Sequence, residues 1–96
     1  DLDFLYYSND MIGMGGLLYC QDAGIDVPGQ IGMAGFNDLE LLDGLPTRLA
    51  TMDSMRIEIG RAAAKIIVSG SKTDGEDSER IEMTPMLQPG GTLRPV

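Results

Sequence analysis

Short apolar segments alternate with helical segments along this chain, and that alternation constrains the fold more than any other feature. The apolar segments are short or alternating, as strands are, and the segments between them carry helical spacing or helix-capping residues. The predicted order is strand 4–7, a helix ending near residue 23, strand 31–36, short helix 40–42, strand 49–52, helix 55–68 and strand 81–84. Strands separated by helices imply a parallel sheet with right-handed crossovers. The sequence therefore predicts an α/β fold with a parallel sheet and flanking helices.

Helix ends are marked by small polar residues and glycines. Asn9, within Ser8-Asn9-Asp10, is a favoured N-cap type, and Gly24 stands where a left-handed C-cap belongs. By the same reasoning Asn37-Asp38 should cap the short helix, and Ser54 should cap the helix that follows it. The tail beyond Pro89-Gly90-Gly91 is expected to be mobile.

The first helix has an unusual interior. Its apolar face is expected to comprise Met11, Met14, Leu17, Leu18 and Cys20. It also contains Gly13, Gly15 and Gly16, and each interior glycine costs a helix roughly 1 kcal/mol relative to alanine. A helix that keeps three glycines is expected to pack very close to another backbone. A phosphate-binding loop is the poorer interpretation, because its glycines would precede the helix.

Short polar side chains follow three of the predicted strands. These groups are Ser8-Asn9-Asp10, Asn37-Asp38 and Asp53-Ser54. In open parallel sheets, ligands bind beyond the carboxyl ends of the strands. The convergence of three such groups predicts a binding site at that edge, although each group could equally be only a cap or a turn.

Composition excludes several functions for this stretch of chain. Asp and Glu number 15 against 7 Lys and Arg, and the basic residues are scattered, so the stretch offers no surface for DNA. Histidine is absent and Cys20 is the single cysteine, so no nucleophile–base pair and no disulfide is expected. The acidic run 74–79 lacks the spacing of a calcium loop and suggests a solvated loop. We expect no catalysis, metal, cofactor or membrane span.

Three blocks of the chain resemble the LacI/GalR family of transcriptional regulators, in matching order and spacing over nearly the whole length. They are residues 7–15 (family pattern xxNDxxAxG), residues 22–38 (xAGxxVPxDxxxxGFDD) and residues 49–64 (LTTVxQxxxxxGxxAA). The ending Gln88-Pro89-Gly90-Gly91-Thr92, together with Arg48-Leu49-Ala50-Thr51, looks most like the gluconate-repressor branch.

The resemblance implies part of a three-layer periplasmic-binding-protein type I fold, in which a sugar-like effector binds between two subdomains. Residues 1–96 would be the C-terminal part of the effector-binding domain, without the N-terminal subdomain and the DNA-binding headpiece. Helix 55–68 would pack on the missing subdomain. The family also implies a cytoplasmic homodimer with Met14 and Leu45 at its interface, and operator DNA bound only through the headpiece.

The same resemblance implies effector-binding roles for Asn9, Asn37, Asp38 and Ser54. Asn37 replaces the usual Asp of the family, and Ser54 replaces a common Gln. An Asn side chain donates as well as accepts and does not repel an anion. Both departures suit an effector with a carboxylate, such as an aldonate, with Arg56 as counter-charge.

Two other interpretations remain open at the level of sequence. A periplasmic sugar-binding protein of an ABC transporter shares the fold and the motifs, although residues 23–28 favour the repressor. A stand-alone α/β enzyme or interaction module would require this chain to fold alone as a cooperative monomer.

Overall fold

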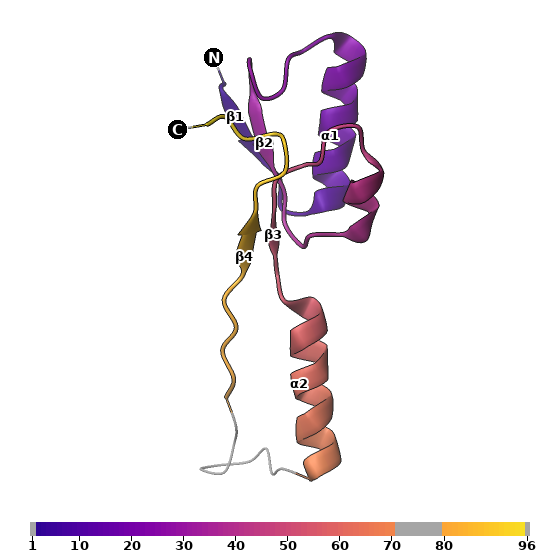
Figure 1. The fold of residues 1–96 in the computed structure, drawn as a ribbon, viewed down its shortest axis with the longest axis vertical. Helices are drawn as coiled ribbons and strands as arrows, with labels where there is room; N and C mark the ends of the chain where they lie inside the picture. The colour runs from indigo at the N-terminus through magenta and orange to yellow at the C-terminus, as the bar shows by residue number, and fades with distance from the viewer. Residues whose placement is uncertain (1, 71–79, 96) are drawn as a thin grey trace.

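The computed structural model describes residues 2–70 and 80–95. The elements, in order, are β1 (Phe4–Tyr6), α1 (Asp10–Ala23), β2 (Gly32–Ala34), the 3-10 helix η1 (Glu40–Gly44), β3 (Thr51–Asp53), α2 (Arg56–Ser69) and β4 (Met86–Gln88). Figure 1 shows an elongated molecule in which α2 extends away from the sheet and α1; its principal extents are 55 × 25 × 19 Å. The predicted loop over the acidic run 74–79 lies outside the described residues.

The first βαβ unit forms as the sequence predicts. Strands β1 and β2 pair in parallel, with Phe4 opposite Gly32 and Tyr6 opposite Ala34, and α1 packs against β2 (Figure 1). The Asn9 side chain accepts a hydrogen bond from the amide of Ile12, and Gly24 ends the helix at φ 75°. Both predicted caps are therefore confirmed.

A small core lies between α1, β2 and the segment that leads into β3. Its buried members are Leu17, Cys20, Met33, Leu42 and Leu49. The predicted apolar face of α1 is only partly right. Leu17 and Cys20 are buried, whereas Met11 and Leu18 are 57% and 45% exposed, because α1 covers the sheet with a narrow stripe of its surface.

Two of the three interior glycines of α1 lie against side chains rather than against another backbone. A Cβ built on Gly13 would stand 2.7 Å from Leu49 Cδ2, and one on Gly16 would overlap the Tyr7 ring. A Cβ on Gly15 would meet nothing within 4 Å. The expected close approach of another backbone is therefore wrong: Gly13 and Gly16 make room for the side chains of Leu49 and Tyr7.

The second half of the chain departs from an all-parallel sheet. Ala34 and Ala50 form an isolated parallel bridge, but β3 pairs antiparallel with β4, with Met52 opposite Leu87. The strand predicted over 81–84 is wrong: the last strand is Met86–Gln88. Residues 80–85 run beside α2 and not beside a described strand (Figure 1). Their alternation of apolar and polar residues is therefore not accompanied by strand pairing.

The tail expected to be mobile is tied to the sheet. Thr92 is fully buried; its hydroxyl donates to the Met33 carbonyl at 2.7 Å and accepts from the Ala50 amide at 2.8 Å. Arg94 donates to the carbonyls of Pro28 and Asp3 at 2.9 and 2.6 Å. The segment after Gly91 therefore joins β2 to the entry of β3, and the prediction of a mobile tail is wrong for residues up to 95.

Helix α2 is less buried than α1. None of its residues is buried, and Ile67 and Val68 are 78% and 86% exposed. None of the helices in residues 2–70 and 80–95 is long and apolar enough to cross a membrane. The apolar positions of α2 have helical spacing, but the described part of the chain buries none of them.

Candidate functional site

The exits of β1, β2 and β3 meet at one edge of the fold. The Asp10 amide, after β1, donates to the Phe36 carbonyl after β2 at 3.1 Å. The Asn37 amide donates to the Met52 carbonyl in β3 at 2.9 Å. The three polar groups singled out in the sequence are thus brought together by backbone hydrogen bonds.

Asn9 stands at the start of α1 and is half-buried. Its Oδ1 accepts from the Ile12 amide at 2.9 Å, in extended backbone with φ −152°. The capping role is shown. The amide Nδ2 of a capping Asn can still donate to a ligand beyond the strand, so an effector-binding role remains a prediction.

Asp10 is the residue of this edge that sequence reasoning placed only as part of a cap. Its side chain is fully buried, with Oδ1 accepting from the Thr51 hydroxyl at 2.7 Å and Oδ2 from the Leu39 amide at 2.9 Å. These bonds join α1, β3 and the turn after β2. A buried carboxylate needs such donors, and the sequence does not say that Thr51 and Leu39 supply them.

Asn37 and Asp38 form a turn with left-handed backbone. Their φ angles are 113° and 56°, and the Asp38 amide donates to the Thr51 hydroxyl oxygen at 3.2 Å. The prediction that this pair caps the short helix is wrong. Leu39 is the residue before η1 and no side chain caps that helix; the Asp38 carboxylate pairs with Arg48 instead.

Arg48, in the segment between η1 and β3, supports the same turn. It pairs with Asp38 at 2.7 Å and with Asp43 at 2.8 Å. The pKa of Arg48 is raised, first of all by the hydrogen bond to Asp43; burial is the next largest effect and lowers it, and the bond to Asp38 and the charges of both carboxylates raise it further. Asp38 is therefore neutralised within the chain, which limits its freedom to bind a ligand.

Ser54 does not cap α2, so that prediction is wrong. Met55 precedes the helix with φ 64°, and the side chain that serves this turn is Asp53, whose Oδ1 accepts from the Met55 amide at 2.9 Å. The left-handed Met55 places Ser54 one residue too early to reach the free amides of α2. Ser54 is half-buried at the exit of β3, and its effector role remains a prediction.

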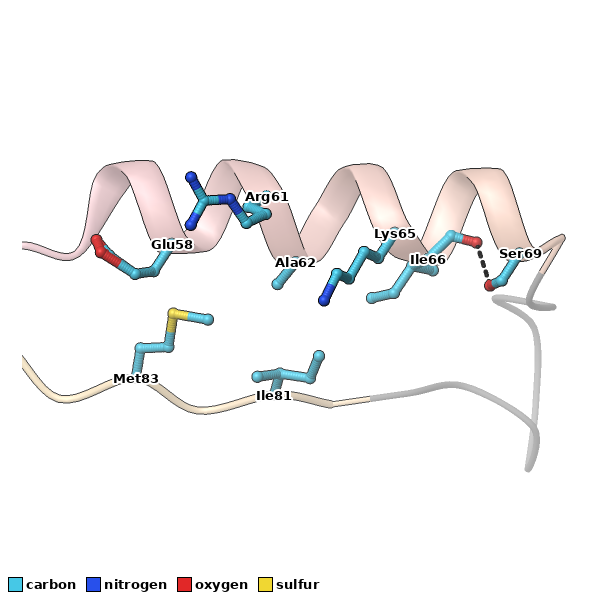
Figure 2. Close-up of a pocket in the computed structure, with 8 residues that line it drawn as sticks. All are labelled: Glu58, Arg61, Ala62, Lys65, Ile66, Ser69, Ile81 and Met83. Atoms are coloured by element: carbon cyan, nitrogen blue, oxygen red, sulfur yellow. Dashed lines mark hydrogen bonds between the residues drawn. The ribbon is translucent and has the colours of Figure 1, made fainter.

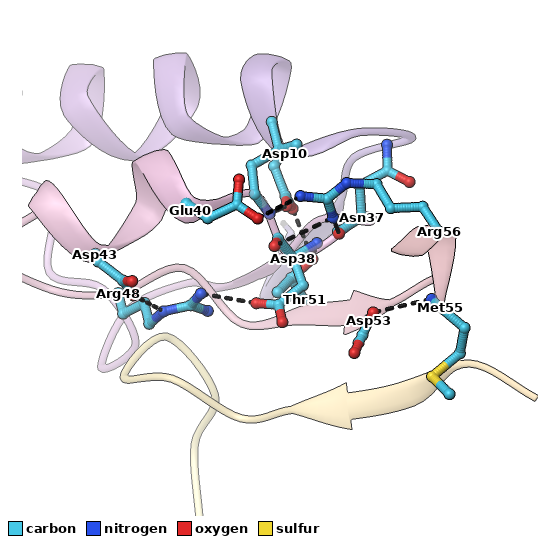
Figure 3. A network of polar contacts seen from close by, with 11 residues as sticks. Asp10, Asn37, Asp38, Glu40, Asp43, Arg48, Thr51, Asp53, Met55 and Arg56 are labelled. Carbon is cyan, nitrogen blue, oxygen red and sulfur yellow. Dashed lines mark hydrogen bonds and ion pairs between the residues drawn. The ribbon is translucent and has the colours of Figure 1, made fainter. Parts of the chain in front are cut away.

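Arg56 is the first residue of α2 and reaches back to the turn after β2, as Figure 3 shows. Its Nη1 donates to the carbonyl of Asn37 at 2.5 Å and, at 3.4 Å, to that of Asp38. Its Nη2 pairs with Glu40 at 2.7 Å. The predicted counter-charge thus lies at the site, but it is already engaged by three oxygens of residues 37–40.

A groove lies elsewhere, between α2 and residues 81–83. It encloses about 490 Å³ and combines apolar side chains with charged ones at its rim (Figure 2). The lining residues are Glu58, Arg61, Ala62, Lys65, Ile66, Ser69, Ile81 and Met83. None of them belongs to the strand exits, so this groove is separate from the predicted site.

Met14 and Leu45, the predicted interface residues, are half-buried and pack against the core cluster. Their partial exposure is compatible with an interface, which stays a prediction. Among the described residues, no group of three or more His, Cys, Asp or Glu side chains could hold a metal ion. Cys20 is buried and free.

In sequence, residues 4–93 of this chain match the family model of the periplasmic binding protein-like domain. The HTH-type transcriptional regulator IdnR of Escherichia coli K12 is 36% identical over 93 residues, which are 97% of this chain and 28% of that protein. The regulator GntR of Pseudomonas aeruginosa PAO1 is 37% identical over 68 residues, or 71% of this chain and 20% of that protein. The chain thus spans less than a third of the length of these relatives.

The solved structures that this chain resembles are also transcriptional regulators. A LacI-family transcriptional regulator from Silicibacter pomeroyi superposes with a TM-score of 0.85 at 59% identity, over 96% of this chain and 28% of that one. A LacI-family regulator from Arthrobacter sp. FB24, in complex with lactose, superposes with a TM-score of 0.82 at 29% identity, over 94% of this chain and 34% of that one.

Proposed function

Since the chain belongs to the periplasmic binding protein-like domain family, in the form carried by LacI-type regulators, we propose that it is the C-terminal part of the effector-binding domain of a transcriptional regulator. The observation that carries the proposal is the junction of three strand exits, tied by the bonds from Asp10 to Phe36 and from Asn37 to Met52. Ligands of open parallel sheets bind at that edge. The relatives compared are regulators, which favours this function over a transporter's binding protein or an enzyme.

The effector we propose is a sugar acid of the gluconate type. The resemblance of residues 48–51 and 88–92 to the gluconate-repressor branch supports an acid, and the lactose complex of a structural neighbour supports a carbohydrate. Asn37 supports the acid as well, because an amide at this turn adds no negative charge beside an effector carboxylate.

The residues proposed to contact the effector are Asn9 and Asn37, at two neighbouring strand exits, and Ser54 at the third. Asp38 is the weaker candidate, because Arg48 already occupies its carboxylate. Asn9 offers its amide Nδ2, since its Oδ1 is used by the cap. This set supplies both donors and acceptors, as the hydroxyls of a sugar acid require.

The rest of the regulator would lie outside this chain. With a net charge of −8, these residues offer no surface for operator DNA, so a headpiece elsewhere in a cytoplasmic protein would bind it. We propose a homodimer with Met14 and Leu45 at the interface. The exposed apolar residues of α2, such as Ile59 and Ile67, would be covered by the first subdomain.

The test is a thermal-shift titration of the full-length protein with gluconate and with glucose. A ligand that binds only the folded state stabilises it by RT ln(1 + [L]/Kd), about 2.7 kcal/mol at a hundredfold excess over Kd. We expect a shift with gluconate that is much larger than with glucose and is lost in Asn37→Ala. The matched control is Gln21→Ala on exposed α1 surface, which should keep the shift. Equal shifts with both ligands would exclude the acid specificity.

A further inference from the structure

The turn at Asn37-Asp38 holds two consecutive non-glycine residues at positive φ. L-residues avoid this region, because Cβ crowds the neighbouring backbone, so such a conformation persists only where the surroundings enforce it. This turn also carries Asn37, which is proposed to contact the effector. What holds the turn therefore decides how well that residue is placed.

The amides of the turn are held from the core side. Thr51 accepts from the Asp38 amide at 3.2 Å, and Asp10 accepts from the Leu39 amide at 2.9 Å. Thr51 and Asp10 are fully buried and bonded to each other, so this half of the support is fixed.

The carbonyls of the turn are held from the opposite side by Arg56. Its Nη1 donates to the oxygens of Asn37 and Asp38, and Nη2 donates to Glu40 at 2.7 Å (Figure 3). A guanidinium presents its donors in a rigid planar fork, so it can fix several acceptors at once, which an ammonium cannot do with the same geometry. Arg56 begins α2, so the clamp also connects the turn to that helix.

We propose that Arg56 is a positioning residue: it clamps the Asn37-Asp38 turn in its left-handed conformation and thereby sets effector affinity without contacting the effector. The affinity part of this inference rests on the proposed function; the clamping part does not. It differs from the role of a counter-charge, in which the guanidinium itself binds the carboxylate of the ligand.

The first experiment needs no effector. Amide hydrogen exchange is measured in the ligand-free full-length protein for the wild type, Arg56→Lys and Arg56→Met. Loss of the clamp should accelerate exchange at Asp38 and Leu39 by roughly tenfold or more in both variants, because local opening of the turn becomes easier. Exchange within α1 should not change, which verifies that the variants are folded.

The control is Arg61→Met, which removes a cation from the exposed surface of the same helix. It should leave exchange at Asp38 and Leu39 as in the wild type. Unchanged exchange at these amides in Arg56→Met would overturn the clamp, whatever the effector proves to be.

The second experiment measures gluconate binding to the same proteins by calorimetry. If Arg56 positions the turn, Arg56→Lys and Arg56→Met should weaken binding to a similar extent, about fivefold or more, because lysine keeps the charge but lacks the fork. If Arg56→Lys binds as the wild type does while Arg56→Met does not, Arg56 is a counter-charge and the positioning role is overturned. If the wild type binds no gluconate, the proposed effector fails, and the exchange experiment still decides the clamp.

Discussion

The hydroxyl of Thr51 donates a 2.7 Å hydrogen bond to the carboxylate of Asp10, and both residues are fully buried. Asp10 opens α1 and Thr51 opens β3, so the bond joins the exit of the first strand to the start of the third, beneath the turn that carries Asn37. The same Thr51 oxygen accepts from the Asp38 amide. Asp10 and Thr51 thus support the turn of the predicted site from the core.

Thr51→Val should destabilise the protein by about 2–3 kcal/mol, because it deprives a buried carboxylate of one of its two donors while keeping the side-chain volume. Thr51→Ser, which keeps the hydroxyl, should cost less than about 1 kcal/mol. Urea unfolding of the two variants measures the difference. A loss in Thr51→Ser as large as that in Thr51→Val would mean that the hydrogen bond to Asp10 contributes no more to the fold than the methyl group of Thr51.

The glycines of α1 provide a matched pair. Gly13→Ala places a Cβ 2.7 Å from Leu49 Cδ2, and overpacking of this kind costs about 1–3 kcal/mol. Gly15→Ala meets nothing within 4 Å and should stabilise by up to about 1 kcal/mol, because alanine is the better helix former. Calorimetric melting should therefore shift in opposite directions. A melting temperature raised by both substitutions would show that Leu49 yields easily.

The two helices should differ in stability when the 96-residue chain is studied alone. Helix α1 buries Leu17 and Cys20, whereas α2 buries no residue, and a 14-residue helix without packing is marginal in water. Amide exchange should be fast throughout α2 and slower in the middle of α1. In the full-length protein, α2 should become protected if a first subdomain covers it. Exchange in α2 that is as slow in the isolated chain as in the full-length protein would contradict that docking.

The correct predictions from the sequence rest on interactions between near neighbours. Asn9 caps α1 through an amide three residues away, and Gly24 closes the helix through the Cys20 carbonyl. Such contacts leave residue types at fixed short spacings. The parallel pairing of β1 and β2 follows from the helix between them, and the meeting of the strand exits follows from that topology.

The wrong prediction of a mobile tail, unlike the wrong caps at Asn37-Asp38 and Ser54, concerns contacts between distant segments. Thr92 bonds Ala50 and Met33, which lie 42 and 59 positions away, so nothing near residue 92 marks the tail as fixed. Likewise Arg56 binds main-chain carbonyls of the turn after β2, and a carbonyl has no side-chain identity to find in a sequence. The meeting of the three strand exits was therefore predictable, whereas the contacts that support the turn after β2 were not.

Asn9 can be tested for its two roles separately with Asn9→Asp. An aspartate accepts the bond from the Ile12 amide as asparagine does, so stability should stay within about 0.5 kcal/mol of the wild type. It also places a negative charge at the proposed effector site, which should weaken gluconate binding by roughly tenfold or more. Gln21→Glu, which adds the same charge at an exposed position of α1, should leave binding unchanged. Calorimetric titration of both variants decides: if Asn9→Asp binds gluconate as the wild type does, Asn9 is a helix cap and does not contact the effector.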